Sequence, residues 1–144
     1  MTRHVGGRAA RLLLAAFVLV LPGCAARSGT AKPPASPGRT LDVREGLASY
    51  YGSAFHGKTT ASGVPFDMNA MVAAHPSYPF GTIVRVTNLV NRRSIQVRIL
   101  DRGPARGPRA AGVLIDLSHG AAQALDFIRA GRTRVRLEVL RWGS

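Results

Sequence analysis

Cysteine and acidic side chains are scarce in this 144-residue chain. A single cysteine, Cys24, means that no disulfide can form within the chain, and a zinc site relying on several cysteines is excluded. Only seven carboxylates stand against 20 basic side chains. Any chemistry that needs a carboxylate therefore has to use a small set of groups: Asp42, Glu45, Asp67, Asp101, Asp116, Asp126 and Glu138.

The N-terminus has no acidic residue and carries a short apolar run. Residues 1–11 contain three arginines, and residues 12–21 (LLLAAFVLVL) are ten consecutive apolar residues, too few for a settled membrane span. The segment that follows, LPGC, resembles a lipoprotein signal-peptidase site. We therefore predict a signal peptide over residues 1–23, with Cys24 diacylated as the first residue of the mature protein. An ordinary secretory signal with a chance cysteine is the alternative.

Residues 24–44 are predicted to be a flexible tether. This segment is rich in Pro, Gly, Ser and Thr and has no apolar period, so it cannot bury a core. Several acyl chains on Cys24 would anchor the protein firmly, whereas one chain binds only marginally. Ala25 is not the aspartate that retains some lipoproteins at the inner membrane. We expect an outer-membrane lipoprotein facing the periplasm, an inner-membrane location being the less favoured alternative.

Residues 45–141 show the alternation of a small β domain. Apolar and polar side chains alternate over residues 82–89, 94–100 and 133–140, which predicts strands with one buried face. The apolar segment 113–117 predicts a more shielded strand. One short helix is predicted after Ser118, a good N-cap, with a stop at Gly131. The pattern favours a small closed β-barrel with one helix.

The charge of the chain is strongly positive. Residues 1–23 contain three arginines, and without them 17 basic and 7 acidic side chains remain, a net charge of +10. Such a surface is either simply soluble or attracts an anionic polymer or lipid leaflet. Because the chain carries an export signal, we do not expect nucleic acid as a partner. Peptidoglycan carboxylates and anionic lipid remain. The charge is concentrated in arginines, four of them at predicted solvent-facing positions: Arg85, Arg98, Arg134 and Arg136.

Five motifs follow one another between residues 46 and 118: GLASYYGSAFHGKTTASG, AAHPSYPFGT, VRVTNL, VRILDRGP and IDLS. Their order and spacing resemble the rare lipoprotein A family of bacterial cell-wall proteins, over roughly residues 46–140. The resemblance implies a six-stranded double-psi β-barrel. It also implies endolytic lytic transglycosylase activity, a lyase reaction on peptidoglycan that gives 1,6-anhydromuramyl ends without a cofactor or metal. Many family members carry a C-terminal glycan-binding module that this sequence lacks, so septal targeting is not predicted.

The candidate catalytic residues come from the DRGP and AAHP motifs. Asp101 continues the inward parity of positions 95, 97 and 99 and precedes a Gly-Pro break, so it is expected at the mouth of the barrel. The resemblance pairs Asp101 with His75, which would donate to a sugar oxygen or orient the carboxylate. The alternative is structural: Asp101 as a turn residue before Gly-Pro, and His75 as a hydrogen-bonding residue of the fold. Asp116 in IDLS is a third candidate, either catalytic or stabilising the start of the helix. Asp67 is interpreted as a loop residue.

Aromatic rings and one arginine complete the predicted site. Exposed rings offer flat surfaces for sugar faces, although at least half of the aromatic residues should belong to the core. A hydrolase generally uses two carboxylates, whereas a lytic transglycosylase can use one as acid and then as base. The residues predicted to bind substrate are Tyr50, Tyr51, Phe55, Tyr78 and Arg102.

Three departures from the family pattern affect the site. Val64 occupies the place of a Glu eleven residues before the histidine, and Leu100 replaces an Asn before DRGP. The loop between DRGP and IDLS is about four residues longer than usual, with Val113 where an Arg is typical. Two alternatives to an enzyme therefore stay open: a non-catalytic glycan-binding lipoprotein, similar to expansin-like binders, and an envelope protein whose partner is a division protein.

Overall fold

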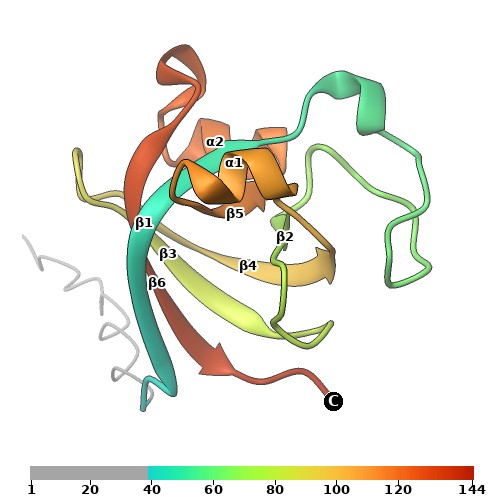
Figure 1. Ribbon diagram of the computed structural model, residues 1–144, viewed down its shortest axis with the longest axis horizontal. Coiled ribbons are helices and arrows are strands. Elements are labelled where there is room, and N and C mark those ends of the chain that lie inside the picture. The colour runs from blue at the N-terminus through green and yellow to red at the C-terminus, as the bar shows by residue number, and fades with distance from the viewer. Residues whose placement is uncertain (1–38) are drawn as a thin grey trace, which may run out of the picture. The chain divides into compact units, whose positions relative to one another are not determined.

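The computed structural model describes residues 39–144, which form a closed, mainly β barrel (Figure 1). Neighbouring strands follow the order β1-β5-β2-β4-β3-β6, and β6 pairs with β1 to close the ring. A closed ring leaves no open sheet edge for another chain to extend. The six strands are β1 (Asp42–Tyr50), β2 (Val72–Ala74), β3 (Ile83–Asn88), β4 (Ser94–Asp101), β5 (Val113–Leu117) and β6 (Thr133–Arg141).

The strand pairing is mixed, as the double-psi topology requires. β1 runs parallel to β5, and β2 runs parallel to β4. The remaining neighbours, including the predicted β3–β4 hairpin, are antiparallel. The prediction of a six-stranded double-psi barrel is thus confirmed.

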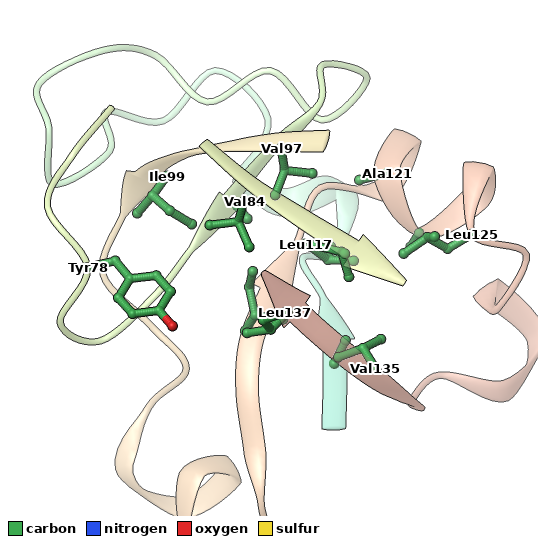
Figure 2. Packing of buried hydrophobic residues seen from close by; sticks show 14 of the residues in the cluster. Tyr78, Val84, Val97, Ile99, Leu117, Ala121, Leu125, Val135 and Leu137 are labelled. Atoms are coloured by element: carbon green, nitrogen blue, oxygen red, sulfur yellow. The ribbon is translucent and has the colours of Figure 1, made fainter. Parts of the chain in front are cut away.

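Period-two alternation explains how the barrel fills its interior. In β3, Val84 and Val86 are fully buried, and Val135, Leu137 and Val139 of β6 are buried in the same way. These side chains meet those of β4, β5 and the helix that follows β5 (Figure 2). Because alternate residues point to opposite faces, the polar residues between them lie outside.

Two short α-helices flank β5, where the sequence predicted one. The predicted helix is α2 (His119–Ala124), and the hydroxyl of Ser118 accepts a hydrogen bond from the backbone of Ala121, as an N-cap does. The additional helix, α1 (Arg106–Ala110), occupies the long loop before β5. Five residues are too few to show a helical period in a sequence. Gly131 ends the 3₁₀ turn η2 (Ile128–Ala130) rather than α2.

The domain begins slightly earlier than predicted. β1 starts at Asp42, inside the segment assigned to the tether, because residues 42–48 pair with β6 over a long antiparallel register. The predicted signal peptide, Cys24 and most of the tether lie outside the described residues. In the described part of the chain, no helix has the length and apolar character that a membrane crossing requires.

Candidate functional site

Asp101 and Asp116, two of the candidate catalytic residues, lie in one row of paired residues that runs across neighbouring strands. Asp116 of β5 lies in register with Ser49 of β1 on one side and Ala74 of β2 on the other. Ala74 in turn lies in register with Asp101 of β4. Adjacent strands lie about 4.8 Å apart, so two strand spacings, about 10 Å, separate the backbones of the two aspartates. In this row, Ala74 of β2 lies between them.

A register shift gives Asp101 its place in this row. The pairing of β2 with β4 goes from Ala73–Ile99 to Ala74–Asp101, so one residue of β4 is skipped. Asp116 alternates with the fully buried Ile115 and Leu117 and so faces away from the core. Simple parity had predicted that Asp101 continues the inward row of Ile99. The bulge instead aligns it with the outward-facing Asp116.

Three donors hold the carboxylate of Asp101. The backbone nitrogens of Ala61 and Arg102 each donate to Oδ1 over 2.8 Å, and the hydroxyl of Tyr51 donates to Oδ2 over 3.2 Å. Burial, followed by the negative charges of Asp101 and Asp116, raises the pKa of Tyr51, so its phenol keeps its proton. Asp101 is therefore fixed in orientation by the loop that contains Ala61 and by Tyr51.

Asp116 has a different environment. The hydroxyl of Ser49 donates to Oδ1, while Oδ2 lies next to Gly103, where an added Cβ would stand 3.1 Å from that oxygen. Burial raises the pKa of Asp116, although the bond from Ser49 and the charge of Arg132 oppose this. Of the two carboxylates, Asp116 thus has a free oxygen and a reason to retain a proton.

A hollow of about 360 Å³ opens beside Asp116. Two aromatic side chains on it are in contact, since the rings of Tyr51 and Phe55 lie 5.1 Å apart. The ring of Phe55 is 46% exposed, which leaves an apolar face open to solvent. We call this the tyrosine hollow; its walls include Tyr50, Tyr51, Phe55, Arg102, Gly103 and Asp116.

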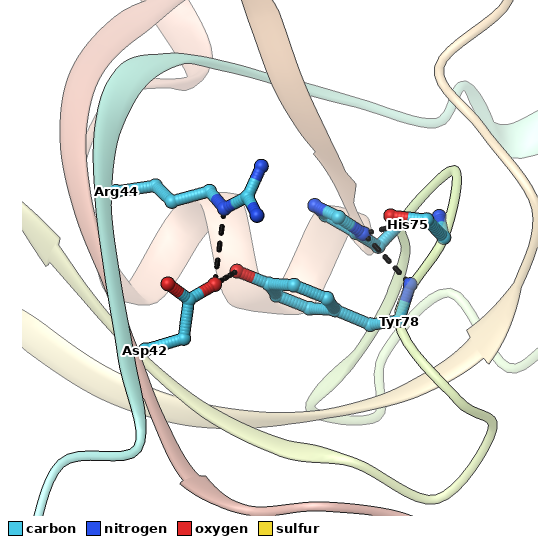
Figure 3. A network of polar contacts seen from close by, with 5 residues as sticks. Asp42, Arg44, His75 and Tyr78 are labelled. Carbon is cyan, nitrogen blue, oxygen red and sulfur yellow. Dashed lines mark hydrogen bonds and ion pairs between the residues drawn. The ribbon is translucent and has the colours of Figure 1, made fainter.

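His75 belongs to a second cluster (Figure 3). Its ring stacks on Tyr78 with 3.6 Å between centroids, and its Nδ1 accepts hydrogen bonds from the backbone nitrogens of Ser77 and Tyr78. The proton of the neutral ring is therefore on Nε2. Burial, together with the charges of Arg44 and Arg102, lowers the pKa of His75 to about 4. His75 is thus neutral near pH 7 and can donate one hydrogen bond, but is a poor general acid.

Tyr78 is largely buried in this second cluster. Its side chain is 4% exposed, and its hydroxyl donates to Oδ2 of Asp42 over 2.7 Å. Burial and this bond raise the pKa of Tyr78 to about 12. The ring is therefore not the open sugar platform that the sequence analysis expected. Asp42 and Arg44, set aside as the end of a tether, complete the cluster; their alternation with the apolar Leu41 and Val43 was the only hint.

Arg102 connects the two clusters. Its backbone nitrogen bonds Asp101, while Nη1 of its side chain donates to the carbonyl oxygens of His75 (3.3 Å) and Tyr78 (2.9 Å). The guanidinium also lies over the ring of Phe80, 3.8 Å from the centroid. Within residues 39–144, no hydrogen bond joins the His75 side chain to Asp101 or Asp116. The side chains of His75 and Asp101 are therefore not in direct contact, contrary to the expectation. The two residues are connected by a backbone hydrogen bond and by Arg102.

The remaining sequence candidates lie in the loop before β2. Asp67 accepts a hydrogen bond from the backbone of Asn69 and lies 4.0 Å from His56, at a well-exposed position. Val64 is 42% exposed, in the same tight loop as Ala61. In the described residues, no group of three His, Cys, Asp or Glu side chains is arranged to hold a metal ion.

The closed mixed barrel, with Asp101 and Asp116 in one row and an aromatic hollow beside Asp116, belongs to the class of small double-psi β-barrel domains. Residues 43–137 match the family model described as lytic transglycolase, and the chain belongs to this family, the RlpA family of double-psi barrels. The endolytic peptidoglycan transglycosylase RlpA of Campylobacter jejuni is 43% identical over 131 residues, covering 85% of this chain and 46% of the relative. A probable RlpA of Treponema pallidum is 54% identical over 95 residues, covering 66% and 29%.

Solved structures support the same fold. A Streptomyces papain inhibitor superposes with a TM-score of 0.56 at 23% identity, covering 72% of this chain and 98% of the inhibitor. The expansin of Clavibacter michiganensis gives a TM-score of 0.54 at 23% identity, covering 72% of this chain and 52% of the expansin. The chain spans less than half the length of the curated relatives described above.

Proposed function

We propose that this domain cleaves peptidoglycan glycan strands as an endolytic lytic transglycosylase. The main support is the row that aligns Asp101 with Asp116, in a chain 43% identical to a protein named for this activity. Asp116 lines the aromatic hollow, and Asp101 is bonded to Tyr51, which also lines it. The open rings suit the apolar faces of sugars. The two carboxylates supply the acid-base chemistry that glycosidic cleavage needs.

Asp116 is the proton donor in this proposal. Its Oδ2 gives a proton to the glycosidic oxygen as the bond from that oxygen to the muramyl anomeric carbon breaks. The resulting carboxylate then takes the proton of the muramyl 6-hydroxyl, whose oxygen bonds to the anomeric carbon. The proton count closes on Asp116, no water is consumed, and the product has a 1,6-anhydro end. Burial of Asp116 supports this role because a general acid has to retain its proton until the reaction.

Asp101 is the second catalytic carboxylate. Fixed by three donors, it places negative charge beside the site, where positive charge develops on the sugar ring in the transition state. His75 is neutral in this proposal and carries a hydrogen-bond donor at Nε2. The sequence analysis named Asp101 as a catalytic candidate and left Asp116 as either catalytic or structural.

Digestion of purified sacculi, with products identified by mass spectrometry, tests this proposal. Wild type should release 1,6-anhydromuramyl ends, and Asp116→Asn and Asp101→Asn should each reduce release by about 100-fold or more. Asp126→Asn is the matched control, since Asp126 is exposed, forms an ion pair with Arg93, and has a positive φ that asparagine tolerates.

The acid-base assignment has its own readout. If Asp116 is the acid, Asp101→Asn should leave residual activity whose loss at high pH still follows the Asp116 pKa. If both aspartate variants still release anhydro ends at the wild-type level, the assignment of Asp101 and Asp116 as the catalytic residues is wrong. A complete lack of such ends from wild type would overturn the activity.

The second candidate function is glycan binding without cleavage. The observation that favours it is the tyrosine hollow itself, whose exposed Phe55 and partly exposed tyrosines bind sugar faces whatever the carboxylates do. In that case the protein should co-sediment with sacculi and release nothing, and Phe55→Ala should weaken co-sedimentation while Asp116→Asn does not.

The location of the domain follows from the same substrate. We propose that Cys24 is acylated and anchors the domain to the outer membrane, with residues 25–41 spanning the distance to the wall. The support is the sequence LPGC after the apolar run 12–21, together with the peptidoglycan activity in the names of the relatives.

A further inference from the structure

A second hollow lies on the other side of the segment that follows β2. It measures about 430 Å³, within the range of small-ligand sites, and its walls are Arg44, Ser77, Tyr78, Pro79 and Trp142. We call it the tryptophan hollow. We propose that the tryptophan hollow is a subsite for a carboxylate-bearing sugar of the glycan strand, with Arg44 binding the carboxylate and Trp142 covering the sugar face. This inference rests on the proposed function for its substrate class.

Arg44 is held so that part of its guanidinium remains available. Its Nε donates to Oδ2 of Asp42 over 3.0 Å, and the same oxygen accepts the hydroxyl of Tyr78. The Arg44 side chain is 54% exposed, and Asp42 is its only carboxylate partner in residues 39–144. Its terminal nitrogens extend toward the free ring nitrogen of His75 (Figure 3). A guanidinium fixed at Nε presents a second edge that suits another carboxylate.

The charge around Arg44 favours an anionic ligand. The Nε2 of His75 carries a proton and is a donor, and Arg102 lies behind it with its charge directed to backbone carbonyls. Burial, and after it the charge of Arg44, lowers the pKa of His75. Asp42 offsets one positive charge and accepts a hydrogen bond from Nε of Arg44. His75 is 2% exposed and does not line the hollow, so Arg44 is the charged group that a ligand in the hollow meets.

Trp142 supplies a fixed apolar wall. Its indole is 40% exposed and meets the ring of Tyr78 edge-on, with 5.3 Å between centroids. The next residue, Gly143, holds it there: its nitrogen donates to Thr82, and an added Cβ would lie 1.8 Å from the carbonyl oxygen of Phe80. Only glycine permits this approach. An exposed indole whose neighbouring backbone is anchored in this way suits stacking against a sugar ring.

The position of the hollow fits an extended strand. Pro76 lines a small depression that shares Arg102 and Gly103 with the tyrosine hollow, and the adjoining Ser77 lines the tryptophan hollow. A glycan that crosses this segment can occupy both hollows at once. The subsite would then select muramyl residues by a carboxylate, either the lactyl group of a peptide-free strand or a carboxylate of a stem peptide.

Trp142 is the only tryptophan, so its fluorescence reports on this hollow alone. The full chain is titrated with four tetrasaccharides: a peptide-free muramyl–glucosamine repeat, its carboxyl methyl ester, the same repeat with peptide stems, and neutral chitotetraose. We expect a carboxylated ligand to change the fluorescence with a Kd at least about tenfold lower than those of the ester and chitotetraose. Binding of the peptide-free acid indicates the lactyl group, and binding only of the peptide-bearing form indicates the stem.

Arg44→Gln should remove this preference, and Arg44→Lys should keep part of it. The matched control is Arg134→Gln, the same charge change on an exposed residue near the opposite end of β6. Equal affinity for acid and ester, or a preference that survives Arg44→Gln, would overturn the proposal. The acid–ester comparison decides in wild type even if an Arg44 variant fails to fold. The titration measures binding, so a preference for the acid over the ester can be observed even if the protein releases no anhydro products. If the protein cleaves sacculi but shows no such preference, the subsite is refuted and the proposed activity stands.

Discussion

The hydroxyl of Tyr51 donates a hydrogen bond to Oδ2 of Asp101, linking the residue after β1 to the end of β4. The same hydroxyl lies close to Gly103, next to Oδ2 of Asp116. Tyr51 therefore stands between the two carboxylates and remains a proton donor, because both negative charges and burial oppose its ionisation. The phenol thus fixes the orientation of the Asp101 carboxylate and makes no hydrogen bond to the Asp116 carboxylate.

Tyr51→Phe tests this arrangement. The ring stays and its contacts with Phe55 and Phe66 persist, but Asp101 loses one of three donors. A hydrogen bond to a charged group contributes about 1.5–3 kcal/mol, so we expect kcat for anhydro-end release to fall by about tenfold or more. Tyr50→Phe is the comparison, since its hydroxyl bonds only the carbonyl of Ile128. An equal loss of kcat in both variants would remove Tyr51 from the mechanism.

The stability of the domain should depend on His75 at mildly acidic pH. The folded-state pKa of His75 is about 4, below its ordinary value of 6.5, so the unfolded chain binds the proton more readily. Stability therefore rises with pH between about 4 and 6.5, and is lost as the pH falls through that window. Between pH 7.5 and 5, we expect a loss of about 2 kcal/mol in unfolding free energy from this residue.

Urea unfolding of wild type and His75→Gln at both pH values measures this loss. Glutamine can accept the two backbone donors through its amide oxygen but does not titrate. The wild type should therefore lose about 2 kcal/mol more than the variant on acidification. Parallel losses in the two proteins would contradict a neutral, buried His75. The comparison is needed because Asp116, with its raised pKa, acts in the opposite direction.

The sequence predicted the barrel better than the site, for physical reasons. Alternation in β3, β4 and β6 reflects burial on one face, and the observed strands agree to within a residue or two. Asp101 and Asp116 lie 15 positions apart in the chain, and only the pairing of both β4 and β5 with Ala74 makes them neighbours. The bulge that aligns Asp101 has no local signal, and five-residue α1 shows no period. Asp42 and Arg44 become part of the site only through their contacts with Tyr78, which lies more than 30 residues away in the chain.

The predicted lipid anchor is tested by Cys24→Ser. The variant keeps the apolar run but loses the only thiol that can be acylated, so the protein should move from the membrane fraction to the soluble periplasm. Fractionation and labelling with palmitate measure the change. Ser53→Cys, which restores one thiol in the described domain, should not restore labelling when combined with Cys24→Ser. A Cys24→Ser protein that stays in the membrane fraction would mean that another feature holds it there.

Val64 separates an enzyme with reduced activity from a binder. It is 42% exposed, its carbonyl accepts a hydrogen bond from the backbone of Thr60, and the neighbouring Ala61 donates to Asp101. A glutamate here extends from the loop that already holds Asp101. Like-charge repulsion would favour a shared proton, and the added charge would stabilise a developing oxocarbenium ion. We expect Val64→Glu to raise the rate of anhydro-end release several-fold, with sacculus binding little changed.

Val90→Glu controls for the added charge, since Val90 is 77% exposed in the turn between β3 and β4, away from the carboxylates. It should leave the rate at the wild-type level. An increase in both variants would trace the effect to net charge rather than to the loop beside Asp101. If wild type and Val64→Glu both bind sacculi and release no anhydro ends, the carboxylates of this barrel serve recognition, and the binding function replaces catalysis.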